Sequence, residues 1–111
     1  MKLITAIVEP DVTDDLVLAV TTAGARGLTA TEVIGLGQDH GRPGTVSSAA
    51  CAALLPRVRV DIVVQDDVAD AVISAIAKSA NTGITGDGKI WVSPVDSVLG
   101  TRTGERDKLA T

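Results

Sequence analysis

Apolar and polar positions follow one another along this chain with two different periods, and each period predicts a type of local structure. Runs of β-branched and aliphatic residues, some alternating with polar ones, are typical of strands, whereas apolar residues three or four positions apart are typical of helices. Strands are predicted at 2–8, 28–36, 57–64 and 89–95, and helices at 11–24 and 66–80. The predicted order is therefore βαβ, a long loop, and βαβ again.

The ends and faces of the two helices also follow from the sequence. Asp11 is expected to cap the first helix, and Gly24 is expected to lie just past its C-terminus. The apolar positions are Val12, Leu16, Val17 and Val20 in the first helix and Val68, Val72, Ile73 and Ile76 in the second. Each helix thus has one apolar face with which to cover a sheet.

The two halves of the chain repeat each other at an offset of 56 residues, since Ile7 corresponds to Val63 and Leu16 to Val72. Two βαβ halves of this length predict a single α+β domain over residues 1–111, with the ferredoxin-like βαββαβ sandwich. The two helices of such a fold cover one face of the sheet. The other face is therefore expected to be covered in a homo-oligomer.

Composition narrows the class of protein. A net charge of −4 and a single aromatic residue, Trp91, argue against nucleic-acid binding. The single Cys51 excludes an intramolecular disulfide framework and fits a reducing compartment. The apolar runs are too short to cross a membrane, and the residues after Lys2 do not resemble a signal peptide. These features predict a cytoplasmic protein without direct membrane insertion.

Two glycine-containing segments are candidates for function: a long loop at about 37–55 and the stretch at about 82–89, TGITGDGK. Long loops in compact domains tend to be functional. The second stretch matches seven of the eight positions of the P-loop pattern, but Ile90 takes the hydroxyl position and the stretch joins a helix to a strand, which excludes a P-loop NTPase. Its glycines still allow backbone N–H groups to bind a phosphate, with Lys89 as a cation. The alternative is a turn that binds nothing.

These motifs occur together in one known family. The stretches MKLITAIV, GLTATEVIGLG, TGITGDGKIWVSPV and RTGE resemble the P-II nitrogen-regulatory signal proteins over nearly the whole chain. The resemblance implies a ferredoxin-like homotrimer that binds ATP or ADP between subunits. It also implies that the long loop, the family's T-loop, controls a partner enzyme or membrane transporter, with a polar tail from about 96 to 111. A regulator of this kind is not an enzyme and has no catalytic residues.

The resemblance also assigns individual residues. It implies nucleotide-binding roles for Ile7, Gly27, Thr29, Gly35, Leu36, Gly37, Gln38, Val63, Thr85, Gly86, Asp87, Gly88, Lys89 and Arg102. Asp39 stands where the family has a glutamine that helps to hold Mg²⁺ beside 2-oxoglutarate, and Arg57 stands where it has a lysine that contacts this acid. Gln38 and Gly100 replace basic residues. Because fewer cations weaken a triphosphate most, ADP or AMP is expected to be favoured over ATP, and 2-oxoglutarate sensing is doubtful.

Two alternatives follow from these departures. One is a P-II-like paralogue that senses ADP, AMP, a cyclic nucleotide or bicarbonate in carbon metabolism or transport. The other is a small ferredoxin-like isomerase, for which His40 is the one candidate acid or base. No protein metal site is predicted, apart from Mg²⁺ bound with a nucleotide. The chain contains no tyrosine, so tyrosyl modification is excluded, and Ser47 or Ser48 is a candidate for phosphorylation.

Overall fold

The computed structural model describes residues 1–36, 54–81 and 88–111. In this part of the chain the strands are β1 (Lys2–Val8), β2 (Thr29–Gly35), β3 (Leu55–Val64) and β4 (Lys89–Pro94), and the α-helices are α1 (Thr13–Thr22) and α2 (Asp66–Ala80). Every predicted element is confirmed, with ends that differ by at most two residues. Leu55, which the sequence placed in the long loop, already pairs with Gly35 in the sheet.

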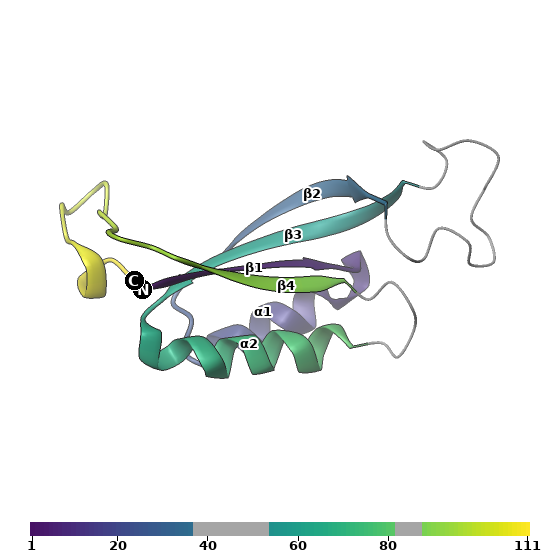
Figure 1. Ribbon diagram of the computed structural model, residues 1–111, viewed down its shortest axis with the longest axis horizontal. Helices are drawn as coiled ribbons and strands as arrows, with labels where there is room; N and C mark the ends of the chain where they lie inside the picture. Colours follow the sequence, from purple (N-terminus) through teal and green to yellow (C-terminus); the bar gives the residue numbers. More distant parts are fainter. Residues whose placement is uncertain (37–53, 82–87) are drawn as a thin grey trace.

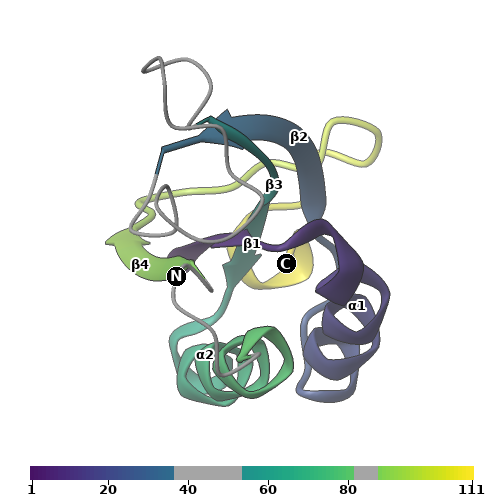
Figure 2. The ribbon, with the colours of Figure 1, turned by 90° about the vertical axis from the view of Figure 1, so that its right-hand side faces the viewer.

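The four strands form one antiparallel sheet in the order β2-β3-β1-β4. Each βαβ half places its two strands on either side of a strand from the other half, which is the arrangement of the ferredoxin-like fold. Both helices lie on the same side of the sheet (Figure 1), and they run side by side beneath it when seen from the end (Figure 2). The predicted fold class is confirmed, and among the described residues neither α-helix lies on the other face of the sheet.

The core lies between the sheet and the two helices. Alternate residues of the two central strands point into it, together with one face of each helix. The side chains that are at most 3% exposed there are Ile4, Ala6 and Val8 of β1, Val60, Ile62 and Val64 of β3, Leu16 and Val20 of α1, and Val72 and Ile76 of α2. These residues form five pairs at the predicted offset of 56. The repeat in sequence is thus a repeat of buried positions.

The prediction for the start of the first helix was wrong. Asp11 does not cap it, because a short 3-10 turn (Pro10–Val12) precedes α1 and contains Asp11. Pro10 fixes its own φ angle near the helical value and starts this turn two residues before Val12, which takes the N-cap position without a side-chain bond. The Thr13 hydroxyl instead donates to the Pro10 carbonyl oxygen at 2.8 Å.

The prediction for the end of this helix is confirmed. Gly24 follows α1 with a φ of +116°, a conformation that side chains disfavour. Its N–H donates to the Thr21 carbonyl at 3.2 Å, and the Ala25 N–H donates to the Val20 carbonyl at 2.9 Å. These two bonds form the Schellman motif, which satisfies carbonyls that the helix end leaves free.

The segment after β4 turns back toward the start of α2. Leu99 pairs with Arg106 in an antiparallel bridge, and the Gln65 side-chain amide donates to the Thr111 hydroxyl at 2.7 Å. This return places the last residues of the chain beside the sheet, where they line a cleft. Neither α-helix in the described ranges is long and apolar enough to cross a membrane.

Candidate functional site

The sheet face without helices, called the open face here, carries most of the predicted binding positions that the structure describes. Successive strand residues point to opposite faces, and Ala6 and Ile62 point to the helices. In the register of the sheet, Ile7 lies between Lys89 on β4 and Arg59 on β3, and Thr29 lies opposite Asp61. The predicted positions on the open face are Ile7, Thr29, Gly35, Arg57, Val63 and Lys89.

One group of predicted residues gathers where α2 ends and β4 begins. Ile7, Gly88 and Lys89 line a cleft of about 300 Å³, together with Val8, Ala77, Ala80, Asn81 and Ile90. Lys89 is exposed, and no ion-pair partner for it is found among the residues that the structure describes. Because the ammonium group is not neutralised by these residues, this cleft offers a positive charge to an anion.

Gly88 has a packing role that does not depend on any ligand. Its φ is +118°, and a Cβ atom at this position would lie 1.7 Å from the carbonyl oxygen of Ile7. No side chain fits into that distance. The backbone before β4 therefore approaches the end of β1 closely, and only glycine permits this approach.

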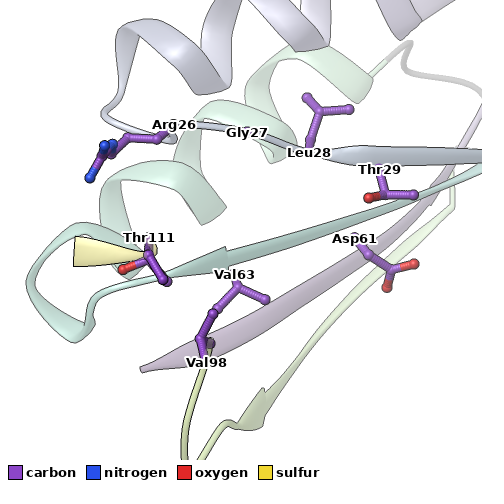
Figure 3. Close-up of a pocket in the computed structure, with 9 residues that line it drawn as sticks. Arg26, Gly27, Leu28, Thr29, Asp61, Val63, Val98 and Thr111 are labelled. Atoms are coloured by element: carbon purple, nitrogen blue, oxygen red, sulfur yellow. The ribbon is translucent and has the colours of Figure 1, made fainter. Parts of the chain in front are cut away.

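A second group lies across the sheet, at the start of β2. Gly27, Thr29 and Val63 line a cleft of about 410 Å³ (Figure 3). The other residues of this cleft are Arg26, Leu28, Asp61, Val98, Ala110 and Thr111. Sequence reasoning missed these six. Arg26 and Leu28 are direct neighbours of Gly27, so the sequence could have placed them in the site. Val98, Ala110 and Thr111 line the cleft only because the tail folds back toward the sheet.

Asp61 lines this second cleft as one half of an ion pair with Arg59. The Thr5 hydroxyl donates to its Oδ1 at 2.7 Å, and Arg59 donates from Nε to Oδ2 at 3.0 Å and from Nη2 to Oδ1 at 3.3 Å. The hydrogen bonds from Arg59 are the main cause that holds the pKa of Asp61 below its ordinary value. Because Arg59 balances the charge of this carboxylate and Arg26 lines the same cleft, Asp61 does not make the cleft negative as a whole. Its oxygens are acceptors for hydroxyl or amino donors, which suits a nucleoside.

Arg102 lies far from the first group. It is exposed in a turn closed by two backbone bonds, from the Gly100 N–H to the Glu105 carbonyl at 2.7 Å and from the Gly104 N–H to the Gly100 carbonyl at 2.9 Å. The whole of β4, about 20 Å at 3.3 Å per residue, separates this turn from Lys89 within one subunit (Figure 1). The two predicted phosphate cations are therefore not brought together in a single chain.

The Arg57 side chain is buried and contacts Glu9 and Pro56. Its Nη2 atom lies 3.3 Å from Oε1 of Glu9, and its Nη1 atom donates to the Pro56 carbonyl at 2.7 Å. Sequence reasoning missed Glu9, although it lies two positions after Ile7 and so falls on the same face of the sheet. Gly35 and Leu36 lie nearby at the end of β2, where a Cβ atom at Gly35 would be 3.8 Å from the Arg57 side chain.

The remaining predicted residues lie outside the described ranges. These are Gly37, Gln38, Asp39, Thr85, Gly86 and Asp87, together with the loop residues His40, Ser47, Ser48 and Cys51. Within the ranges that are described, no three His, Cys, Asp or Glu side chains gather as a metal site would require.

Comparison with known proteins places the whole chain in one family. A family model described as nitrogen regulatory protein P-II matches residues 1–105. The chain is 40% identical over 111 residues to the nitrogen regulatory protein GlnK of Escherichia coli strain K12, covering 99% of both chains. It is 42% identical over 111 residues to the nitrogen regulatory protein P-II 2 of Methanothermobacter thermautotrophicus, covering 99% of this chain and 96% of that one. The resemblance read from the sequence is confirmed: the chain belongs to the P-II family of nitrogen-regulatory signal-transduction proteins.

Proposed function

We propose that this protein forms a trimer that binds ATP or ADP in the clefts between its subunits. We further propose that nucleotide occupancy changes how residues 37–55 engage a partner enzyme or membrane transporter, so that the protein reports the energy state of the cell during nitrogen regulation. This role is regulatory and not catalytic, and its setting is the cytoplasm.

The division of the predicted residues into two clefts supports this proposal most directly. The cleft at Gly88 and Lys89 and the cleft at Gly27 and Thr29 share no residue and lie at opposite edges of the sheet. We infer that a nucleotide contacts the first group of one subunit and the second group of its neighbour. Because closed symmetry repeats the same contact around a ring, each subunit then gives one group and receives the other.

The polar groups of the two clefts support one orientation of the nucleotide. The exposed Lys89 ammonium suits the phosphates, whereas the Asp61 oxygens and the Thr29 hydroxyl suit the hydroxyl and amino groups of a nucleoside. We therefore propose that the phosphates lie on the Lys89 side and the nucleoside on the Thr29 side of each interface.

One observation favours the second candidate function, in which ADP or AMP is the preferred ligand. Arg57 is engaged by Glu9, and the position of Gly100 carries no side chain. Among the described residues, Lys89 and the neighbouring subunit's copy of Arg102 are then the main cations for phosphates. Fewer cations reduce the advantage of a third phosphate, and a paralogue that reads ADP, AMP, a cyclic nucleotide or bicarbonate in carbon metabolism or transport fits the same pattern.

Calorimetric titration with ATP, ADP, AMP and cyclic AMP, each with and without Mg²⁺, tests both candidates. The expected result is one nucleotide for each subunit, with an affinity for ADP at least equal to that for ATP. Clearly tighter ATP binding would reject the second candidate and keep the first. If none of the four binds, the glycine-rich stretch is only a turn and both candidates fail.

A further inference from the structure

The tail after β4 supplies one wall of the second cleft. Val98, Ala110 and Thr111 line this cleft together with residues of β3 and of the segment that leads into β2 (Figure 3). Val98 comes from the start of the tail, whereas the other two residues come from its end. The wall therefore depends on contacts that hold the two parts of the tail together.

Asp107 makes these contacts. Its carboxylate Oδ1 accepts the Val98 N–H at 3.0 Å, and its own N–H donates to the Val98 carbonyl oxygen at 2.9 Å. Its carbonyl oxygen accepts the N–H groups of Ala110 at 2.9 Å and Thr111 at 3.1 Å, and also the Thr111 hydroxyl at 3.1 Å. The same hydroxyl accepts a bond from the Gln65 amide at the start of α2. Asp107 thus joins both parts of the wall, and Gln65 ties the wall to the helix.

The backbone conformation of Asp107 fits this role. Its φ is +53°, the one positive value at a residue other than glycine in the described part of the chain. Most side chains disfavour this left-handed conformation, and Asp and Asn tolerate it because their short polar groups bond to nearby backbone. Asp107 is exposed and lies outside the core. Its hydrogen bonds therefore fix the path of the tail and add little to the burial of apolar residues.

We propose that Asp107 is a positioning residue for the second cleft. It touches no ligand itself but holds Val98 and Thr111 where they form the wall against which a nucleoside binds. The inference rests on the proposed function, because it takes the second cleft to receive the nucleoside end of the nucleotide. Without these bonds the wall has to be ordered when the nucleotide binds, and this ordering reduces the affinity.

Calorimetric titration of the full chain with AMP and ADP tests this inference. In Asp107→Ala the Val98 N–H loses its acceptor and the left-handed backbone becomes unfavourable, so both nucleotides should bind about fivefold or more weakly. Asp96→Ala is the matched control, since it removes the same charge from an exposed position of the same tail that does not line the cleft. Equal affinity of Asp107→Ala and the wild type, or equal weakening in the control, overturns the inference.

Two further variants separate the hydrogen bond from the charge. Asp107→Asn keeps an oxygen acceptor and tolerates the left-handed conformation, so its affinity for AMP should stay within about twofold of the wild type. Asp107→Gly keeps the conformation but offers no acceptor to Val98, so it should bind weakly, as Asp107→Ala does. The inference is wrong if Asp107→Asn binds as weakly as Asp107→Ala, or if Asp107→Gly binds as tightly as the wild type.

Amide hydrogen exchange reports the position of the tail without any ligand. The Val98 and Thr111 amides should exchange about tenfold or more faster in Asp107→Ala than in the wild type and in Asp107→Asn. The amides of the central strands β1 and β3 should exchange at the same rate in all three proteins, because the core is unchanged. Equal exchange of the Val98 amide in Asp107→Ala and the wild type contradicts the inference.

These measurements distinguish failure of this inference from failure of the proposed function. If the wild type binds AMP and ADP and Asp107→Ala binds them equally well, the nucleotide site stands and only the role of Asp107 is wrong. If the wild type binds neither nucleotide, the proposed function fails and the role of Asp107 in binding fails with it. The exchange rates then show only whether Asp107 holds the tail.

Discussion

Lys89 and Thr29 lie on the same face of the sheet but on its two opposite edge strands, so that β1 and β3 separate them. Three strand spacings and an offset of two residues place their Cα atoms about 16 Å apart. Each belongs to a cleft that the other does not line. This separation is the geometric basis for the proposal that a neighbouring subunit completes the nucleotide site, and it leads to the first prediction.

Replacement of Lys89 by alanine should weaken ATP and ADP binding by about tenfold or more, because it removes the exposed cation of the cleft that is proposed to hold the phosphates. Lys78→Ala is the control, since Lys78 is an exposed cation in the last turn of α2 that does not line the cleft. Equilibrium dialysis with labelled nucleotide measures both. Equal weakening in the two variants would mean that the net charge of the protein, and not the position of Lys89, determines the affinity for nucleotide.

Mixed assemblies should show whether Lys89 and Arg102 act from different subunits, as proposed. Lys89→Ala and Arg102→Ala are each expected to bind nucleotide weakly. When the two are unfolded together and refolded, some clefts receive Lys89 from one chain and Arg102 from another, so binding should partly return. If both residues acted within one subunit, every cleft would stay defective and the mixture would bind no better than its components.

Gly88→Ala should lower the free energy of unfolding by at least about 2 kcal/mol, because its φ is +118° and the new methyl would meet the Ile7 carbonyl oxygen at 1.7 Å. Gly27→Ala is the matched control in the other cleft, since a Cβ atom there has no neighbour within 4 Å. Urea unfolding at one fixed protein concentration compares them. A loss of stability in Gly27→Ala as large as that in Gly88→Ala would argue against the close approach.

Two leucines of α1 allow a prediction of how much burial in the core contributes to the free energy of unfolding. Leu16 is fully buried, so Leu16→Ala should cost about 2–5 kcal/mol of unfolding free energy. Leu18 lies on the same helix and is 69% exposed, so Leu18→Ala should change the stability of the isolated fold by about 0.5 kcal/mol or less. A large loss for Leu18→Ala, measured by the same urea unfolding, would indicate that this face of α1 is covered in the assembly.

The environment of Asp61 leads to a prediction of how the free energy of unfolding depends on pH. Its pKa is lowered in the folded protein, mainly by hydrogen bonds from Arg59. The folded state thus holds the proton less tightly than the unfolded state, so the contribution of Asp61 is full above the ordinary carboxyl pKa of about 4 and is lost as pH falls through the lower, folded value. Asp61→Asn should therefore lose less stability than the wild type between about pH 5 and pH 2.

The control for this pH dependence is Asp70→Asn, at an exposed position of α2. It removes one carboxylate at a different site, so a change in pH dependence as large as that of Asp61→Asn would mean that the loss of any carboxylate has this effect. If the free energy of unfolding of Asp61→Asn falls with pH in parallel with that of the wild type, the contact with Arg59 does not contribute to stability.

The apolar pattern in the sequence was sufficient to predict the strands and helices, and the offset of 56 that relates Leu16 to Val72 reappears as a pair of buried core positions. It was not sufficient for contacts that depend on how distant segments meet. The pairing of Glu9 with Arg57 needs the register of β1 against β3, and the place of Thr111 in the second cleft needs the return of the tail. The prediction that Asp11 caps the first helix was wrong because Pro10 begins a short 3-10 turn, and Asp11 lies inside this turn.

The strand order also has a consequence for folding kinetics. The central pair, β1 and β3, joins residues roughly fifty to sixty positions apart, from Lys2 with Val64 to Val8 with Val58. Its formation closes a large loop and should limit the folding rate. Residues 37–53 lie inside that loop, and because closure entropy grows only with the logarithm of length, adding or removing a few of them changes the rate little. The segment proposed to meet the partner can therefore diverge in evolution at almost no cost to folding.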